Sequence, residues 1–233
     1  MNYSVVIPSK NPENCIACVR AVASMEPDAN IIIVDDGARA GAEPVLRGLR
    51  YEGRLTWAKG LEPFIYARNC NIGIRVAPLD HAVILLNDDA LLTTPGGFTA
   101  MVSQFETHPE YGVVSAVTNN VGNARQLPNA GRAGAGDGLR DEPTFLCFVC
   151  VAIARATLNQ VGFLDERFTE YGSEDVDYSY RALQAGLKLG IFDGCVMEHG
   201  KLQSTFRKDG PRPIRPGQQI FMDKHGHGVT WGR

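Results

Sequence analysis

The stretch Ala82-Val-Ile-Leu-Leu-Asn-Asp-Asp89 decides the fold class of this chain. Its apolar half, Ala82 to Leu86, is typical of a buried strand, and two carboxylates follow the strand at once. A second stretch, Asn30 to Val34, has the same form and ends in Asp35-Asp36-Gly37. Buried strands that alternate with segments of helical periodicity predict an α/β domain with a mainly parallel central sheet flanked by helices.

The segments around these two strands continue the alternation. We expect further strands at residues 3–8, 54–57 and 112–117, and helices at 13–25, 42–50, 64–76, 98–106 and 156–161. Residues 119–143 break the pattern because they are rich in Gly, Ala, Asn and Arg, and we interpret them as a flexible loop, preferably a lid. Beyond an apolar stretch at 145–153, residues 188–192 and 195–197 are predicted as edge strands.

Length and composition limit the class of protein. The chain has 233 residues, of which 44% are hydrophobic and 21% charged, as expected for a globular protein with one large or two small domains. No apolar run reaches the roughly 18 residues of a membrane span. The start of the chain has no basic region followed by an apolar one, so we predict no signal peptide and a cytoplasmic location.

The six Cys residues include two pairs with the spacing Cys-x-x-Cys, Cys15/Cys18 and Cys147/Cys150. A zinc site of two such pairs is conceivable. However, the first pair falls in a predicted helix, and the second in an apolar strand whose residues three apart point to opposite faces. We therefore favour buried, reduced thiols.

Charge is distributed unevenly along the chain. Residues 1–200 hold 16 Lys and Arg against 24 Asp and Glu, a net charge of −8, whereas residues 201–233 hold 7 against 2, a net charge of +5. A basic tail on an acidic body suggests contact with a phosphate, an anionic acceptor or nucleic acid. The alternative is a tail that folds back onto the acidic body.

A carboxylate cluster occurs at the start of a predicted helix, in Tyr171-Gly-Ser-Glu-Asp-Val-Asp177. Ser173 suits the N-cap position, and Glu174 and Asp175 then lie in the first turn. These carboxylates could simply complement the helix dipole. However, clustered carboxylates repel one another, which raises the pKa of one of them and suits a general base for an alcohol.

The other carboxylate pair, Asp88 and Asp89, is placed where ligands of such sheets bind, beyond the carboxyl end of a strand. One or two carboxylates there are sufficient to bind a hard divalent cation that also contacts a diphosphate. Taken alone, the pair could be an ordinary turn. Similarly, His199 in Glu198-His-Gly200 could be structural, and it gains weight as a metal ligand only in combination with the acidic clusters.

These motifs together resemble the family 2 glycosyltransferases of the GT-A (Rossmann-like) fold. The resemblance covers residues 1–200, in which the family's motifs occur in order. They are Val5-Val-Ile-Pro8, Ile33-Val-Asp-Asp-Gly37, Ala67-Arg-Asn-Cys-Asn-Ile-Gly73, Leu86-Asn-Asp-Asp-Ala90, Gly162-Phe-Leu-Asp-Glu166, Glu174-Asp-Val-Asp177 and His199. In addition, Phe221-Met-Asp-Lys-His-Gly226 resembles a Lys-Trp-Gly element of some members, with His in place of Trp.

The resemblance implies a role for each matching position. Nucleotide contacts are implied for Pro8, Asp36, Arg68 and Asp88, metal binding (Mn²⁺ or Mg²⁺) for Asp89 and His199, catalysis as the base for Asp175, and acceptor orientation for Glu174. Two positions depart from the family: Asn87 begins the acidic motif, and Ala38 replaces the usual Ser after Asp-Asp-Gly.

The resemblance also implies an activity and a domain plan. We expect an inverting, metal-dependent glycosyltransferase that uses a nucleotide-sugar, a UDP-sugar by preference, and a saccharide acceptor. Residues 1–118 then form the nucleotide-sugar-binding half, 119–143 the loop, 144–200 the acceptor and catalytic half, and 201–233 the basic tail.

Three alternatives remain open at this stage. The basic tail admits a hydroxymethylated base in DNA as the acceptor. A nucleotidyltransferase also has an α/β sheet and a metal that binds a diphosphate, although Ser9-Lys-Asn-Pro-Glu13 is not its usual Gly-rich loop. The third alternative is a non-catalytic module that binds sugar nucleotides.

Overall fold

A computed structural model describes residues 1–128, 138–169, 172–200 and 216–226 of the chain. Its strands are β1 (Tyr3–Ser9), β2 (Asn30–Asp35), β3 (Arg54–Lys59), β4 (Ala82–Leu86), β5 (Ala90–Leu92), β6 (Tyr111–Thr118), β7 (Leu139–Glu142), β8 (Cys150–Ile153) and β9 (Lys188–His199). Its helices are α1 (Pro12–Met25), α2 (Arg39–Leu46), α3 (Tyr66–Val76), α4 (Gly97–Thr107), a 3₁₀ turn η1 (Ala124–Gln126), α5 (Arg155–Val161), α6 (Glu174–Gln184) and α7 (Pro216–His225).

The strands form one sheet in the order β3-β2-β1-β4-β8-β6-β9-β5, with β7 attached to β9. The first four strands pair in parallel. Beyond them the sheet is mixed, because β8 runs antiparallel to β4 and β6, and β5 and β7 run antiparallel to β9. The predicted α/β domain is confirmed, but its parallel character is limited largely to the N-terminal half.

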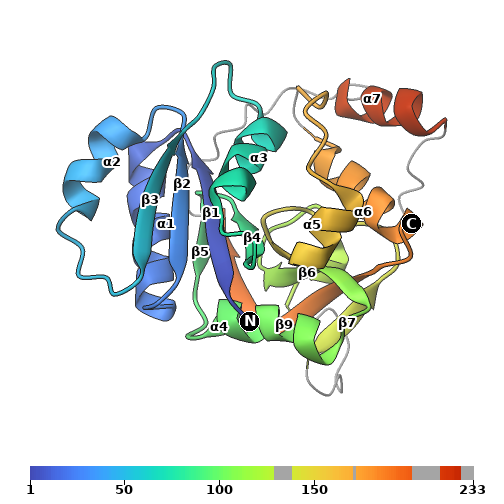
Figure 1. Cartoon of the computed structure of the whole chain (residues 1–233), viewed down its shortest axis with the longest axis horizontal. Helices are drawn as coiled ribbons and strands as arrows, with labels where there is room; N and C mark the ends of the chain where they lie inside the picture. The colour runs from blue at the N-terminus through green and yellow to red at the C-terminus, as the bar shows by residue number, and fades with distance from the viewer. Residues whose placement is uncertain (129–137, 170–171, 201–215, 227–233) are drawn as a thin grey trace.

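Helices cover both faces of this sheet (Figure 1). On one face α1, α2 and α4 pack on side chains such as Val5 and Ile31, and on the other α3, α5 and α6 pack on their sequence neighbours Val6 and Ile32. Successive strand residues point to opposite faces, so a strand that is apolar at every position needs cover on both. This requirement is why the continuous apolar runs of the sequence predict the three-layer architecture.

Residues 119–128 and 138–143 are more regular than the predicted loop. The Asn123 amide donates to the Phe145 carbonyl at 2.8 Å, and the Gln126 amide donates to the Cys147 carbonyl at 3.0 Å. Residues 139–142 form β7, in which Arg140 makes a bidentate pair with Asp193 at 2.7 and 2.8 Å. Residues 139–142 are therefore a strand and not a loop, the lid stays a prediction, and residues 129–137 lie outside the described residues.

The two predicted edge strands near residue 190 are one strand. β9 runs unbroken through Asp193 and Gly194 and lies inside the sheet, between β6 and β5. Its register against β6 jumps from Ala116 opposite Phe192 to Val117 opposite Val196. Asp193 and Gly194, which separate the two predicted strands, therefore lie in a bulge, where side chains depart from the regular alternation.

All six Cys residues are free thiols, and five of them are buried. Burial raises the pKa of the Cys15 thiol to about 12 and that of the Cys18 thiol well above its ordinary value. These thiols behave as small apolar side chains of the core. None of the described helices has the length and apolarity needed to cross a bilayer.

The tail helix α7 packs on the start of α6, next to it in Figure 1. Phe221 is 1% exposed and joins a small core with Phe145, Phe168 and Val176. The described part of the basic tail thus folds back onto the body, whereas residues 201–215 and 227–233 lie outside the described residues.

We expect Gly73→Ala to destabilise the fold. A Cβ on Gly73 of α3 would lie 2.2 Å from Val6 Cγ1 in β1, so α3 has to move away from the sheet. Overpacking of this kind costs about 1–3 kcal/mol, more than the ~1 kcal/mol that Ala gains over Gly in a helix. Urea unfolding of Gly48→Ala, whose Cβ would meet nothing nearer than 3.6 Å, is the control. Equal stability of both variants would contradict this packing.

Candidate active site

A cavity of about 360 Å³ opens where several strands end. The turn after β4 supplies Asn87 and Asp89, the end of β9 supplies His199, and the start of α6 supplies Glu174 and Asp175. Its volume lies within the range of small-molecule sites. The sequence-predicted metal ligands and catalytic carboxylates therefore line one cavity, although they are far apart along the chain.

Strand pairing explains why Asp89 meets His199. β5 pairs with β9 so that Ala90 lies opposite His199, and Asp89 immediately precedes β5. As a result, His199 Nε2 lies 3.4 Å from Asp89 Oδ1. Asp89 is 6% exposed, so its carboxylate is largely shielded from solvent.

The His199 ring is oriented by its backbone surroundings. Its Nδ1 lies 2.6 Å from the Asn120 carbonyl oxygen, which can only accept, so Nδ1 carries the proton. In neutral His199 the Nε2 lone pair then faces the Asp89 carboxylate. Burial lowers the pKa of His199, but the hydrogen bonds with Asp89 and Asn120 outweigh burial and raise it overall. Both findings show that this pair attracts a positive charge, which is the property a metal site requires.

A divalent cation fits this donor set. Oxygen and imidazole ligands suit Mn²⁺, and Mg²⁺ is usually held by one or two carboxylates together with substrate phosphates. Within the described residues no cluster of three His, Cys, Asp or Glu side chains is able to hold a metal. A cation bound by Asp89 and His199 therefore needs further oxygen ligands, which a diphosphate supplies.

The two carboxylates of α6 follow an unusual turn. Gly172 has a φ of 102° and Ser173 a φ of 75°, so two successive residues are left-handed, and one of them is not Gly. Ser173 is the N-cap residue of α6, as the sequence predicts, but its side chain makes no capping hydrogen bond. Left-handed backbone is costly for Ser, so the surrounding packing must impose it.

Glu174 and Asp175 are held in different ways. Glu174 is 8% exposed, and its Oε2 has no partner among the described residues. The half-buried Asp175 accepts from the Val176 backbone N–H at 2.8 Å. Burial raises the pKa of both carboxyls, and for Glu174 the adjacent Asp175 charge raises it further. The pair is thus suited to hold one proton between an acid and a base.

Asp88 is directed away from the cavity. Its Oδ2 accepts from Ser9 Oγ at 2.7 Å inside the protein. Burial raises its pKa to about 6, although the Ser9 bond lowers it. By contrast, Asn87 lines the cavity with a buried Oδ1 that lacks a partner among the described residues. The structure thus gives Asp88 a bracing contact, and Asn87 is the better placed of the two to contact a ligand.

The remaining nucleotide candidates lie at the ends of neighbouring elements, outside the lining of this cavity. Asp36 follows β2, and burial raises its pKa, while the nearby charges of Lys10 and Arg68 lower it. The Arg68 guanidinium donates to the carbonyls of Leu61 and Pro63, and its buried Nε has no partner among the described residues.

Pro8 is buried in β1 opposite Val34, beyond the last β1–β4 pair, Val6 with Leu85. The missing N–H of Pro8 therefore breaks no pairing with β4.

Other cavity residues were not predicted. Tyr66, Asn120 and Gln218 line the cavity, and Tyr66 donates its hydroxyl to the Phe148 carbonyl at 3.1 Å. Tyr66 directly precedes the predicted Ala67-Arg-Asn motif, which is the one sequence signal that points to it. Asn120 and Gln218 come from segments that were interpreted as loop and tail.

We expect Ser9→Ala to lower stability by about 1–3 kcal/mol, because it leaves the buried Asp88 carboxylate without a hydroxyl donor. Ser24→Ala in the same N-terminal region is the matched control, since Ser24 is exposed on α1. Urea unfolding compares the two. If Ser9→Ala unfolds like Ser24→Ala, the bracing role of Asp88 is wrong.

Comparisons with known proteins identify relatives of the chain. The chain is 25% identical over 223 residues to a hyaluronan synthase of Pasteurella multocida, a match that covers 77% of this chain and 22% of that protein. It is 39% identical over 82 residues to a chondroitin synthase of Pasteurella multocida strain Pm70, which covers 32% of this chain and 8% of that protein. The chain therefore spans less than a quarter of the length of these relatives.

Solved structures share the fold. GalNAc-T7 with UDP, GalNAc and Mn²⁺ matches with a TM-score of 0.70 at 13% identity, over 85% of this chain and 44% of that one. The mannosyltransferase PcManGT from Pyrobaculum calidifontis, in complex with GDP-Man and Mn²⁺, matches with a TM-score of 0.64 at 18% identity, over 84% and 56%. These are glycosyltransferases of the GT-A type.

At the level of sequence, residues 4–163, more than half of the chain, match the family described as Glycosyl transferase family 2. This match includes the β4–β5 turn with its acidic motif, and the fold places that turn in the cavity described above. The chain therefore belongs to glycosyltransferase family 2.

Proposed function

We propose that this glycosyltransferase is an inverting, metal-dependent enzyme that moves a sugar from a UDP-sugar to a hydroxyl group of a saccharide acceptor. One observation carries the proposal: the Asp89–His199 pair and the Glu174–Asp175 pair line the same cavity. The first pair suits a metal that holds a diphosphate, and the second suits a base that acts on an alcohol. Membership of the family favours sugar transfer over the nucleotidyl transfer and the non-catalytic binding that the sequence left open.

The reaction requires a base on the side of the sugar opposite the leaving group. Asp175 removes the proton of the acceptor hydroxyl, and the oxygen attacks the anomeric carbon as the bond to the diphosphate oxygen breaks. The leaving electron pair goes to the diphosphate, and the proton stays on Asp175. Attack from the opposite face inverts the anomeric configuration. Protonated Glu174 donates a hydrogen bond that orients the acceptor.

Asp89 and His199 would hold the Mn²⁺ or Mg²⁺ ion. When bound, such an ion offsets the negative charge that develops on the leaving diphosphate. The chain's own contribution is to fix these ligands: β5–β9 pairing sets their separation, and the Asn120 carbonyl sets the tautomer of His199.

The nucleotide is proposed from the neighbours and from the ends of the parallel strands. Neighbouring structures contain UDP with Mn²⁺, UDP-GlcNAc in Staphylococcus aureus TarS, and GDP-Man with Mn²⁺. Asp36 and Arg68 lie at the ends of β2 and α3 in the N-terminal half, and the resemblance implies that they contact the nucleotide there. We expect Asn87, which lines the cavity, to make the nucleotide contact that the resemblance implies for Asp88.

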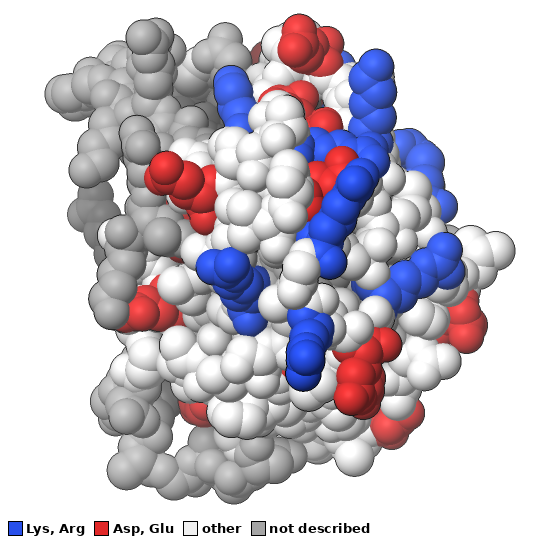
Figure 2. Space-filling view, turned by 90° about the vertical axis from the view of Figure 1, so that its left-hand side faces the viewer, with Lys and Arg blue, Asp and Glu red and all other residues white. Residues whose placement is uncertain are grey.

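A saccharide is a better acceptor than DNA for the described surface. Figure 2 shows Lys and Arg side chains next to Asp and Glu side chains on the face that carries α2, where Arg39 and Arg47 both pair with Glu43. In the described part of the tail, Lys224 and His225 already pair with Asp177. Residues 1–200 also carry a net charge of −8, which repels a polyanion such as DNA.

The first experiment is a thermal-shift panel of nucleoside diphosphates with and without Mn²⁺. A ligand at about 100 times its dissociation constant adds roughly 2.7 kcal/mol, or about 5–10 °C for a chain of this size. We expect a Mn²⁺-dependent shift with UDP that is lost in Asp89→Ala and weakened in Asn87→Ala.

Asp88→Asn is the matched control in this panel and should keep most of the UDP shift. A thermal shift with GDP alone would mean that the donor is a GDP-sugar and not a UDP-sugar, and the proposed mechanism would be unchanged. The absence of a shift with every nucleotide would overturn the proposal.

The pH dependence of turnover tests the base. Asp175 acts only when deprotonated, and its pKa is raised by burial, so activity is present above that pKa and is lost as pH falls through it. We expect the acid limb of kcat to lie above the pH range of an ordinary Asp.

Asp175→Asn should lower kcat by roughly 10²–10⁴-fold while sparing the UDP shift. If Asp175→Asn stays active and its kcat still falls at low pH as in the unchanged chain, a group other than Asp175 is responsible for that fall.

A further inference from the structure

The C-terminal helix α7 forms part of the wall of the cavity. Gln218 lines it together with Gly172 and Ser173, the two residues that precede the catalytic pair. The neighbouring Gly217 is buried against the same turn: a Cβ on Gly217 would lie 1.8 Å from the Gly172 carbonyl oxygen and 3.5 Å from Ser173 Cβ. Only Gly permits this approach, which brings Gln218 to the cavity.

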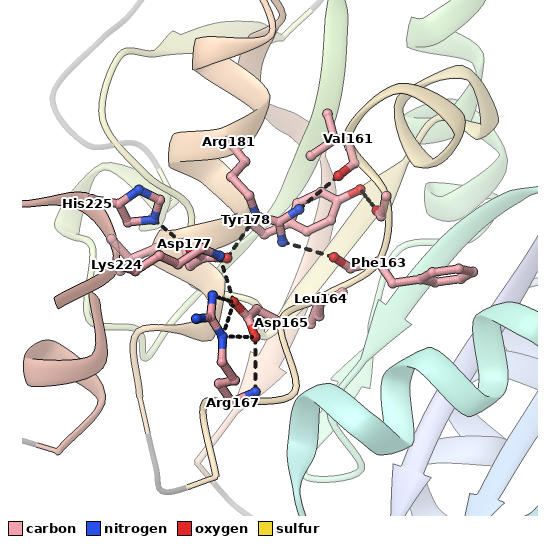
Figure 3. A network of polar contacts seen from close by, with 12 residues as sticks. Val161, Phe163, Leu164, Asp165, Arg167, Asp177, Tyr178, Arg181, Lys224 and His225 are labelled. Atoms are coloured by element: carbon pink, nitrogen blue, oxygen red, sulfur yellow. Dashed lines mark hydrogen bonds and ion pairs between the residues drawn. The ribbon is translucent and has the colours of Figure 1, made fainter. Parts of the chain in front are cut away.

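Charged contacts hold the other end of α7 in place. Figure 3 shows Lys224 and His225 directed at Asp177, which is fully buried two residues after Asp175. Lys224 Nζ lies 2.7 Å from Asp177 Oδ1 and 2.7 Å from Asp165 Oδ2, and His225 Nε2 lies 2.8 Å from Asp177 Oδ1. Arg181 contacts the second oxygen of Asp177 at 2.8 Å.

The apolar side of α7 adds to this attachment. Phe221 packs on the Tyr180 ring with their centroids 5.7 Å apart and lies in the same small core as Val176. α7 is thus fastened to α6 by Gly217 at its start, Phe221 in its middle and Lys224 and His225 at its end. Its position relative to the catalytic carboxylates is set by direct contact.

The location of Gln218 suggests its ligand. Asp89 and His199 define the diphosphate side of the cavity, and the donor residues come from the N-terminal half. The turn Gly172–Ser173 directly precedes Glu174 and the proposed base Asp175, and Gln218 lines the cavity beside this turn. An acceptor hydroxyl has to reach Asp175, so it has to bind near this part of the wall. An amide has both a donor and an acceptor group, as does a sugar hydroxyl, and it carries no charge that would favour an anionic group.

We propose that Gln218 is a contact residue for the saccharide acceptor. Gly217, Lys224 and His225 are positioning residues: Gly217 packs on the Gly172 turn, Lys224 and His225 contact Asp177, and together they hold Gln218 in the wall of the cavity. This inference rests on the proposed function. Gln218 contributes to acceptor affinity and not to donor binding or to the chemistry of Asp175.

The test uses the full chain with Mn²⁺, UDP and p-nitrophenyl glycosides of glucose, N-acetylglucosamine and glucuronic acid as acceptor probes. Binding of each glycoside to the UDP-loaded protein is measured by saturation-transfer NMR, and transfer is measured with the corresponding UDP-sugars. We expect Gln218→Ala to raise the acceptor KM and dissociation constant about 3–10-fold, with kcat and the UDP thermal shift unchanged.

Gln219→Ala is the matched control, because Gln219 is the adjacent, exposed residue of the same type on α7. Lys224→Met should raise the acceptor KM as well, and in the double variant with Gln218→Ala the two effects should not multiply. Lys224→Arg should restore most of the affinity. This pattern separates positioning from a general loss of stability.

The outcomes distinguish a failure of the role proposed for Gln218 from a failure of the proposed function. If UDP binds and a glycoside binds equally well to Gln218→Ala and to the unchanged chain, the role of Gln218 is wrong and the proposed function stands. If Gln218→Ala weakens UDP as much as the glycoside, Gln218 belongs to the donor side and the inference is overturned. If UDP does not bind, or no glycoside binds to the UDP-loaded protein, the proposed function fails and the inference fails with it.

Discussion

The pairing of β5 with β9 is the interaction on which the rest of the site depends. It joins the turn after β4, where the N-terminal parallel sheet ends, to a residue more than 100 positions later in the chain. Because Ala90 lies opposite His199, Asp89 and the imidazole meet without any flexible segment between them. A slip of one residue in this register would turn His199 to the opposite face of the sheet.

Burial of acidic groups is the second constraint, and it works against stability. Asp88, Asp89, Glu174 and Asp177 are all less than 10% exposed. Asp177 is offset by Arg181 and Lys224, and Asp88 by the Ser9 hydroxyl. Glu174 Oε2 has no such partner among the described residues. Asp88 and Asp177 therefore have partners inside the protein, whereas one oxygen of Glu174 has none among the described residues, and such buried groups are typical of functional sites.

The sequence predicted the architecture where hydrophobic pattern decides it. β4 was placed to the residue, and β2 and α3 to within two, because their apolar residues face a core on which the whole segment depends. The prediction from sequence is wrong where contacts between distant residues override the local hydrophobic pattern. β7 carries three charged residues, so its local pattern predicts a loop; only its partner β9 and the pair Arg140–Asp193 make it a strand. The site was predicted as a set of residues, but sequence order does not reveal that Asp88 faces Ser9 while Asn87 faces the cavity.

The distance in sequence between the parts of the cavity has a consequence for how the protein is made. Residues 1–92 contain the four parallel strands and Asp89, so this part of the sheet is the first to leave the ribosome. Asp175, His199 and α7, which contribute the other walls of the cavity, come much later in the chain. Contacts of such large sequence separation form late, since the loop between them must close first. Because the lining of the cavity extends from Tyr66 to Gln218, the cavity is complete only when the C-terminal part of the chain has folded.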